Sequence, residues 1–123
     1  MADNSKNNNI NEQVFRPWGY YRVIAKGDGY EVKVIHVNQG GQLSVQSHNH
    51  RAEHWVVAFG KAKARSGDKT FELEVGQSLD IPVHAIHSLA NPFDKDLEII
   101  EVQLGALLSE DDIIRYSDIY GRA

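Results

Sequence analysis

Residues 46–55, QSHNHRAEHW, hold three of the six histidines of the chain together with a glutamate and an arginine. Imidazole nitrogens and carboxylate oxygens bind divalent metals, and imidazole also titrates near neutral pH. The stretch therefore indicates either a metal site or a histidine-based acid/base site. A polar loop with hydrogen-bonded histidines is the plain alternative.

Strand geometry favours a metal site. Side chains two residues apart on a strand point to the same face, so Gln46 and His48 are expected to lie together. Glu53 follows the short loop 49–52, opens the next strand and can return to that face. His87, behind the turn sequence IPVHAIH, supplies a fourth donor. Three or four nitrogen and oxygen ligands leave a divalent ion with room for water or substrate.

Short β-like runs separated by turn sequences must position these side chains. The turns KGDG, NQGG, SGDK and NPFDKD are rich in glycine, asparagine and aspartate. The spacing predicts an all-β antiparallel sandwich or barrel. The expected strands cover residues 18–25, 30–37, 42–47, 53–59, 61–66, 70–75, 77–82, 85–90 and 97–104.

The two ends of the chain differ from this pattern. Residues 1–14 are polar and rich in asparagine, and we expect them to form a tail outside a single domain over residues 15–123. The sequence LLSEDDIIRYSDIYGR predicts one short C-terminal helix. Its signals are an N-cap, acidic residues in the first turn and a glycine beyond the end: Ser109, Glu110, Asp111, Asp112 and Gly121.

Composition narrows the function classes. The net charge of −4 argues against a protein that binds nucleic acid or anionic membranes in general, because binding to either needs a basic face on the protein. The chain has no cysteine, so a metal must be held by nitrogen and oxygen. Neither a secretory signal nor a membrane-spanning apolar run is evident, so we expect a cytoplasmic protein.

Two sets of residues match known motifs in spacing and order. The first set, which resembles the first cupin motif, is Gly40, Gln46, His48, Glu53 and Gly60. The second set, which resembles the second cupin motif, is Gly76, Pro82, His87 and Asn91. Gln46 stands where a histidine is usual, and His84 stands where a glycine is usual.

Longer segments resemble the isomerase domain of type II mannose-6-phosphate isomerases, which is often fused to a guanylyltransferase domain; we expect the isomerase module alone here. They include RPWG at 16–19, LSVQSHNHRAEHWVV from Leu43, IPVHAIHSLANP from Ile81 and EDDIIRYSDIYGR from Glu110. The resemblance implies a jelly-roll cupin, usually a homodimer, that interconverts mannose 6-phosphate and fructose 6-phosphate with a divalent metal. We expect zinc first, with iron, manganese, nickel or cobalt as alternatives. The implied ligands are Gln46, His48, Glu53 and His87.

An aldose–ketose isomerase must move a proton between adjacent carbons and hold anionic oxygens. Glu101 is the leading candidate for the general base, because burial among apolar neighbours would raise its pKa. Further candidate catalytic residues are Arg51 and His50. Candidate substrate-binding residues are Lys33, Arg51, Gln103 and His84.

Other residues have plainer expected roles, and other functions stay open. We expect His36 to be structural, His54 to be structural or interfacial, and Arg16 and Arg115 to form structural ion pairs. The expected partner is a small sugar phosphate. The alternatives are a cupin that binds metal or sugar without catalysis, and a cupin enzyme of another kind, such as a dioxygenase or another sugar isomerase.

Overall fold

Antiparallel strands account for nearly all regular structure in the computed structural model, which describes residues 10–106, 108 and 110–120. The expected all-β architecture is confirmed, and each expected run contains a strand. The strands are β1 (Val14–Arg16), β2 (Gly19–Gly27), β3 (Tyr30–Val37), β4 (Val45–Ser47), β5 (Arg51–Phe59), β6 (Lys61–Ser66), β7 (Lys69–Glu74), β8 (Ser78–Ile81), β9 (His87–Ala90), β10 (Leu97–Gly105) and β11 (Ile114–Ser117).

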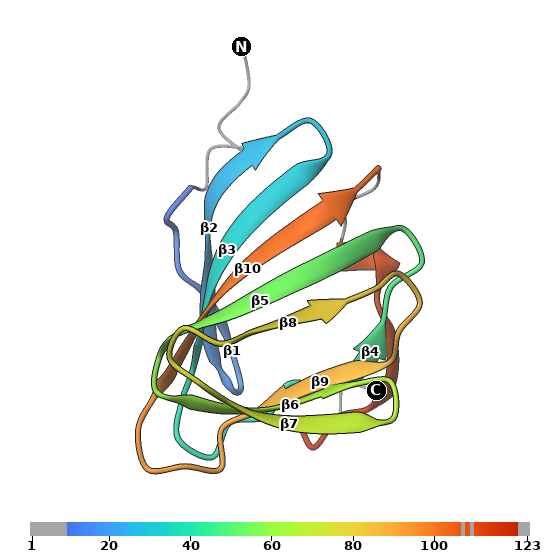
Figure 1. The fold of residues 1–123 in the computed structure, drawn as a ribbon. Helices are drawn as coiled ribbons and strands as arrows, with labels where there is room; N and C mark the ends of the chain where they lie inside the picture. Colours follow the sequence, from blue (N-terminus) through green and yellow to red (C-terminus); the bar gives the residue numbers. More distant parts are fainter. Residues whose placement is uncertain (1–9, 107, 109, 121–123) are drawn as a thin grey trace.

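The strands form two sheets that face each other (Figure 1). The six-stranded sheet has the order β1-β2-β3-β10-β5-β8, and the five-stranded sheet has the order β11-β4-β9-β6-β7. From β3 onward the chain passes repeatedly from one sheet to the other, so strands distant in sequence become neighbours. Gln46 thus pairs with His87, and Glu53 pairs with Gln103.

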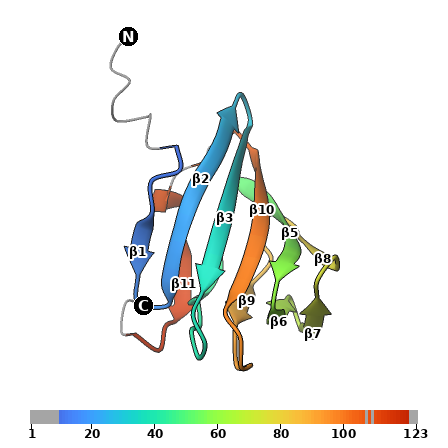
Figure 2. The same cartoon turned by 90° about the vertical axis from the view of Figure 1, so that its left-hand side faces the viewer.

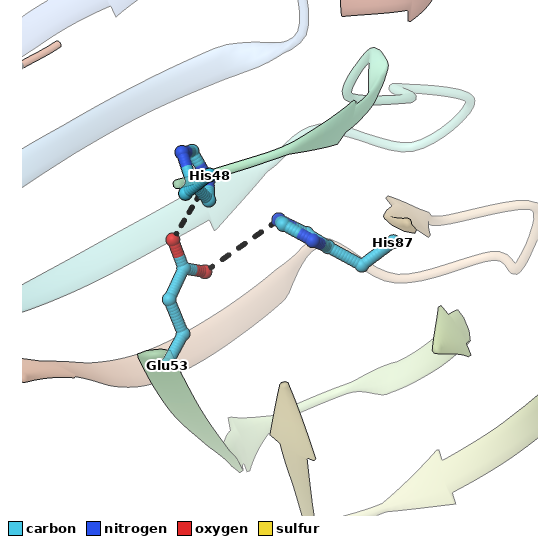
Figure 3. A group of neighbouring side chains, drawn as sticks. All are labelled: His48, Glu53 and His87. Atoms are coloured by element: carbon cyan, nitrogen blue, oxygen red, sulfur yellow. Dashed lines mark ion pairs between the residues drawn. The ribbon is translucent and has the colours of Figure 1, made fainter. Parts of the chain in front are cut away.

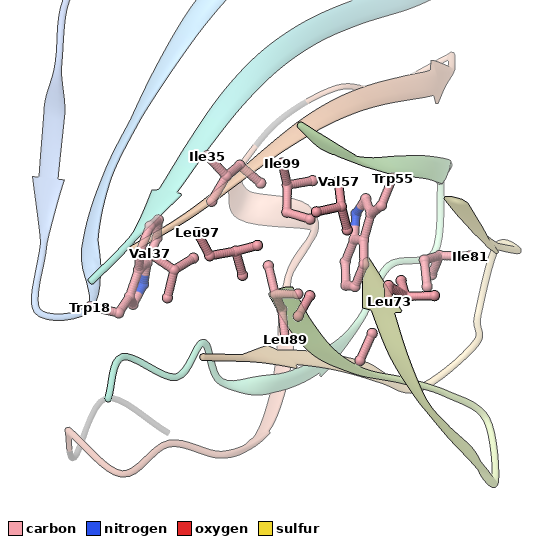
Figure 4. Close-up of a cluster of buried hydrophobic side chains, with 12 residues drawn as sticks. Trp18, Ile35, Val37, Trp55, Val57, Leu73, Ile81, Leu89, Leu97 and Ile99 are labelled. Carbon is pink, nitrogen blue, oxygen red and sulfur yellow. The ribbon is translucent and has the colours of Figure 1, made fainter. Parts of the chain in front are cut away.

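The space between the sheets has an apolar end and a polar end. Side chains such as Val37, Leu97, Ile99 and Leu89 are fully buried at the apolar end (Figure 4). Further along the same inward faces, β3, β5 and β10 carry buried polar and charged side chains: Lys33, Arg51, Glu53, Glu101 and Gln103. The apolar end forms the core, and the polar end forms the candidate site.

The predicted C-terminal helix is wrong. The chain makes a single 3₁₀ turn, Glu110–Asp112, and then β11, which pairs with β4. The Asp112 carboxylate accepts hydrogen bonds from the backbone amides of Asn49 and His50 instead of capping a helix of its own. The alternating sequence IRYS then completes the edge of the five-stranded sheet. Ser109 and Gly121 lie outside the described residues.

Two boundaries also differ from the expectation. β5 begins at Arg51, so the histidine loop is shorter than the expected loop 49–52. Within the expected N-terminal tail, residues 1–9 lie outside the described part, whereas Ile10 forms a bridge with Val23 and Val14 begins β1. In the part of the chain that the structure describes, no helix has the length and apolar character needed to cross a membrane.

Candidate metal centre

Three buried side chains bring their donor atoms together at the polar end. His48 follows β4, Glu53 lies on β5 and His87 begins β9; one ligand atom of each lies within 4.8 Å of the others. Figure 3 shows both imidazoles directed toward the Glu53 carboxylate. His48 Nε2 is 3.1 Å from Glu53 Oε2, and His87 Nε2 is 3.9 Å from Glu53 Oε1.

Backbone carbonyls fix the orientation of both histidines. Nδ1 of His48 is 2.9 Å from the Asp112 carbonyl oxygen, and Nδ1 of His87 is 3.0 Å from that of Ala85. A carbonyl oxygen only accepts, so each Nδ1 carries the hydrogen and donates it. In a neutral ring Nε2 then carries no hydrogen, and its lone pair faces the Glu53 carboxylate. Burial lowers the pKa of His87, outweighing the charge of Glu53, and so favours this neutral form.

Gln46 contributes a fourth donor to the same place. It lines the cavity and pairs with His87 across the strands. Its Nε2 donates to Ser44 Oγ at 2.9 Å, with the Ser44 carbonyl oxygen at 3.4 Å. The amide nitrogen is therefore engaged by Ser44, and the amide oxygen is the atom left to bind a cation.

The position of Arg51 indicates that this donor set suits a metal ion. Its Nη2 lies 2.9 Å from Glu53 Oε2 and 3.2 Å from His48 Nε2. The guanidinium thus supplies positive charge to two lone-pair atoms that would otherwise repel each other. A divalent ion would supply the same charge to all the converging donors, and paired Nδ1–H···O=C bonds are typical of histidines that bind metal. The residues fit such an ion.

A second carboxyl group lies beside the donor set. Trp55 Nε1 donates to Glu53 Oε1 at 2.9 Å and to Glu101 Oε2 at 3.1 Å. Burial and the neighbouring charge of Glu53 raise the pKa of Glu101 well above its usual range. Burial acts on Glu53 in the same direction, but a hydrogen bond with Glu101 and the positive charge of Arg51 hold the pKa of Glu53 well below its usual range. Both shifts favour a protonated Glu101 next to an ionised Glu53.

These groups open into a cavity of about 630 Å³, counting its mouth. Lys33 lines it, with Nζ 3.8 Å from Glu31 Oε2 and 4.5 Å from the Tyr21 ring centroid. Gln103 also lines it and donates from Nε2 to Glu101 Oε1 at 2.7 Å. Among the described residues Gln103 Oε1 has no hydrogen-bond partner although it is buried, so it can accept a bond from a ligand hydroxyl.

Two arginines that the sequence suggested were structural line this cavity. Neither Arg16 nor Arg115 forms an ion pair with any described residue. Arg115 lies on β11 directly opposite Gln46, and the guanidinium carbon of Arg16 lies 5.5 Å from the Tyr21 ring centroid. The run IRYS alternates as a strand does, but only its pairing with β4 places Arg115 opposite Gln46.

Two other predicted site residues do not line the cavity. His50 and His84 are both exposed. His84 has a φ of 71°, the left-handed conformation that explains why glycine is usual at this place. Its backbone nitrogen donates to the His48 carbonyl oxygen at 2.8 Å, and its ring Nδ1 is 3.2 Å from Asn49 Oδ1. His84 thus joins its own turn to the histidine loop.

Comparison with known proteins identifies the family of this chain. Residues 3–118 match the family model described as the mannose-6-phosphate isomerase C-terminal domain. The alginate biosynthesis protein AlgA of Pseudomonas aeruginosa is 52% identical over 110 residues, which cover 89% of this chain and 23% of that protein. Mannose-1-phosphate guanylyltransferase of Escherichia coli K12 is 46% identical over 121 residues, 98% of this chain and 25% of that protein.

The same comparisons bear on fold and length. The cupin domain of Schizosaccharomyces pombe Cnp3 matches with a TM-score of 0.67 at 14% identity, covering 70% of this chain and 64% of that one. This confirms the expected cupin fold. The chain spans about a quarter of the length of the two relatives named above.

Proposed function

Because this chain belongs to the family of mannose-6-phosphate isomerase C-terminal domains, we propose that it is a metal-dependent aldose–ketose isomerase that interconverts mannose 6-phosphate and fructose 6-phosphate. The observation that carries the proposal is a second buried carboxyl group, Glu101, which shares the Trp55 Nε1 donor with a carboxylate of the metal-ligand set inside one cavity; burial and that neighbouring charge raise the pKa of Glu101. The guanylyltransferase activity in the names of relatives is not proposed for this chain.

The metal would be held by Gln46, His48, Glu53 and His87, and we expect zinc before iron, manganese, nickel or cobalt. When bound, such an ion polarises the sugar oxygens and stabilises the negative charge of an enediolate. Arg51, which lies against two of these ligands, is placed to add a second positive charge at the same oxygens.

Proton transfer is assigned to Glu101. As a buried acid it can donate its proton to a sugar oxygen, and the carboxylate so formed can take the proton bound to carbon. Gln103 and Trp55 donate to its two oxygens and hold the group in place. His50 stays a candidate proton carrier only if its exposed loop closes over the substrate.

We assign binding of the substrate's phosphate group to the cationic side chains of the cavity. Lys33 lies inside, and Arg16 and Arg115 have guanidinium groups without carboxylate partners among the described residues. Arginine and lysine are the usual ligands of phosphate oxygens, and the overall charge of −4 means that local cations must attract the anion. Gln103 Oε1 would accept a sugar hydroxyl. We place the protein in the cytoplasm, because sugar phosphates are ionised and do not cross membranes unaided.

A coupled assay for fructose 6-phosphate formed from mannose 6-phosphate tests the proposal. Metal-stripped protein would be reloaded with zinc, cobalt or manganese and compared with His48→Ala and His87→Ala. His54→Ala is the matched control, because His54 lies on the other side of its strand. We expect metal-dependent turnover that both ligand variants lose and the control keeps.

Full metal occupancy without turnover under any metal would overturn the isomerase assignment. Binding of the sugar phosphate without turnover would then identify a non-catalytic metal- or sugar-binding cupin. Metal-dependent oxygen consumption would identify a dioxygenase, and turnover of another sugar a different isomerase.

A further inference from the structure

The ring of Tyr21 lies within reach of two cations that line the cavity. Lys33 Nζ is 4.5 Å from the ring centroid, and the guanidinium carbon of Arg16 is 5.5 Å from it. The face of an aromatic ring attracts a cation at such distances, because its π electrons carry partial negative charge. Tyr21 itself lines the same cavity and is half-buried. One uncharged side chain therefore orients two charged ones at a place that a ligand can enter.

The strand registers place Tyr21 between these two cations. Figure 2 shows β1, β2 and β3 side by side at one edge of the six-stranded sheet. Tyr21 pairs with Val14 on β1 and with Ile35 on β3. Arg16 and Lys33 each stand two residues from one of those partners and on the same face of its strand. Each cation is thus a diagonal neighbour of the ring, and the two lie toward opposite ends of β2.

A neutral ring holds cations in a different way from a carboxylate. The Arg51 guanidinium lies 2.9 Å from the Glu53 carboxylate, so its charge is balanced within the metal-ligand set. A tyrosine ring has no net charge, so cations that it orients keep their positive charge for a ligand. Glu31, whose carboxylate is 3.8 Å from Lys33, is shared with Lys26 at 3.9 Å. The charged groups on this side of the cavity therefore stay positive in sum.

We propose that Tyr21 is a positioning residue that holds Arg16 and Lys33 as a clamp for one phosphate group, here called the phosphate clamp. That the ligand is a sugar phosphate rests on the isomerase assignment. The 4.5 Å and 5.5 Å distances run to the same centroid, so the two charges lie within about 10 Å of each other. A phosphate monoester fits between them, because its oxygens accept hydrogen bonds of about 2.8 Å from cations on either side.

The clamp is also correctly spaced from the group assigned to proton transfer. Glu101 pairs directly with Lys33 on the neighbouring strand, and Tyr21 lies one strand beyond Lys33. Neighbouring strands are about 4.8 Å apart, so Tyr21 and Glu101 are roughly 10–12 Å apart along the sheet. An open six-carbon chain with its phosphate at the clamp reaches Glu101 with its other end. The phosphate should therefore supply affinity while the chemistry takes place at the far end of the sugar.

Calorimetric binding of mannitol 1-phosphate to the cobalt-loaded protein is the first test, because this hexitol phosphate has no carbonyl group to isomerise. We expect Tyr21→Leu to weaken binding roughly tenfold and Tyr21→Phe, which keeps the ring, to retain most of the affinity. Phe71→Leu is the matched control: Phe71 is packed against the same core but does not line the cavity. Circular dichroism checks that the variants fold. Absence of binding by wild type, or equal binding by Tyr21→Leu and wild type, overturns the proposal.

Variants of the cations show whether the ring acts through them. Arg16 is exposed, so Arg16→Gln should fold normally and should weaken binding of mannitol 1-phosphate about tenfold; unchanged affinity would overturn the clamp by itself. In a chain that carries Arg16→Gln and Lys33→Gln together, adding Tyr21→Leu should cost less than twofold, because the ring has no cation left to hold. A further tenfold loss in that background would overturn the positioning role.

Turnover separates the clamp from the isomerase assignment. Tyr21→Leu should raise KM for mannose 6-phosphate about tenfold with little change in kcat, and Tyr21→Phe should restore KM. Binding of mannitol 1-phosphate that depends on the ring, without turnover of mannose 6-phosphate, overturns the isomerase assignment and leaves the clamp. Turnover with an unchanged KM in Tyr21→Leu overturns the clamp and leaves the isomerase assignment.

Discussion

Asp112 should control metal affinity although it is not a ligand. Its carbonyl oxygen accepts the Nδ1 hydrogen of His48, and its carboxylate accepts the backbone hydrogens of Asn49 at 3.1 Å and His50 at 2.9 Å. These bonds fix both the ring of a ligand and the loop that carries it. In Asp112→Asn the carboxamide can accept at one oxygen only, so one charge-assisted bond is lost, about 1.5–3 kcal/mol. Groups that orient a ligand typically contribute 10- to 100-fold in metal affinity, so we expect a loss of about that size.

Competition with a chromophoric chelator for zinc or cobalt measures the effect. Asp68→Asn is the control, because it removes the same charge from an exposed turn between β6 and β7 and so matches any general electrostatic effect. Circular dichroism of the metal-free proteins separates a loosened site from a loss of fold. Equal affinity in the two variants would show that the loop is held without Asp112 and would refute the reasoning.

Three further predictions concern turnover and stability. Glu101→Gln keeps the shape of the side chain but cannot exchange a proton, so kcat should fall about 100-fold or more while metal affinity, read by the same chelator competition, is retained. Arg115→Gln should raise KM for mannose 6-phosphate about tenfold with little change in kcat, as expected for a lost phosphate contact; an unchanged KM would remove this arginine from the site. Burial lowers the pKa of His36, but its hydrogen bonds to Glu98 and Asp96 outweigh this and raise it above 6.5. The charged form is therefore favoured by folding, and its contribution, present in full below pH 6.5, is lost as pH rises through the folded pKa. The melting temperatures of wild type and His36→Gln should therefore converge at high pH. A difference in melting temperature that stays constant with pH would contradict this.

The strands were predictable because local signals and tertiary structure agree there. The run 30–37 coincides with β3 and the run 61–66 with β6, since turn residues mark their ends and alternation sets the buried face. Motif spacing likewise brought His48, Glu53 and His87 to one place, because strand pairing turns fixed spacing into proximity.

The C-terminal segment was not predictable, because local and tertiary preferences conflict there. Acidic residues before an apolar run are a good helix start, but β4 has a free edge that pairs with Ile114–Ser117. The position of Asp112 against the histidine loop follows from that pairing and leaves no sign in the local sequence. The same holds for Arg115, which only the register of β11 places opposite Gln46.

The two ends of β10 show how one strand serves stability and chemistry separately. Leu97 and Ile99 point inward and are fully buried in the core, and Glu101 and Gln103 follow on the same face at the cavity. A slip of one residue would move all four to the outside, so the apolar pair fixes the register that places the polar pair. Substitutions at the cavity end should therefore alter chemistry with little effect on pairing. Substitutions at Leu97 or Ile99 should disturb both, because the site depends on a register set by the core.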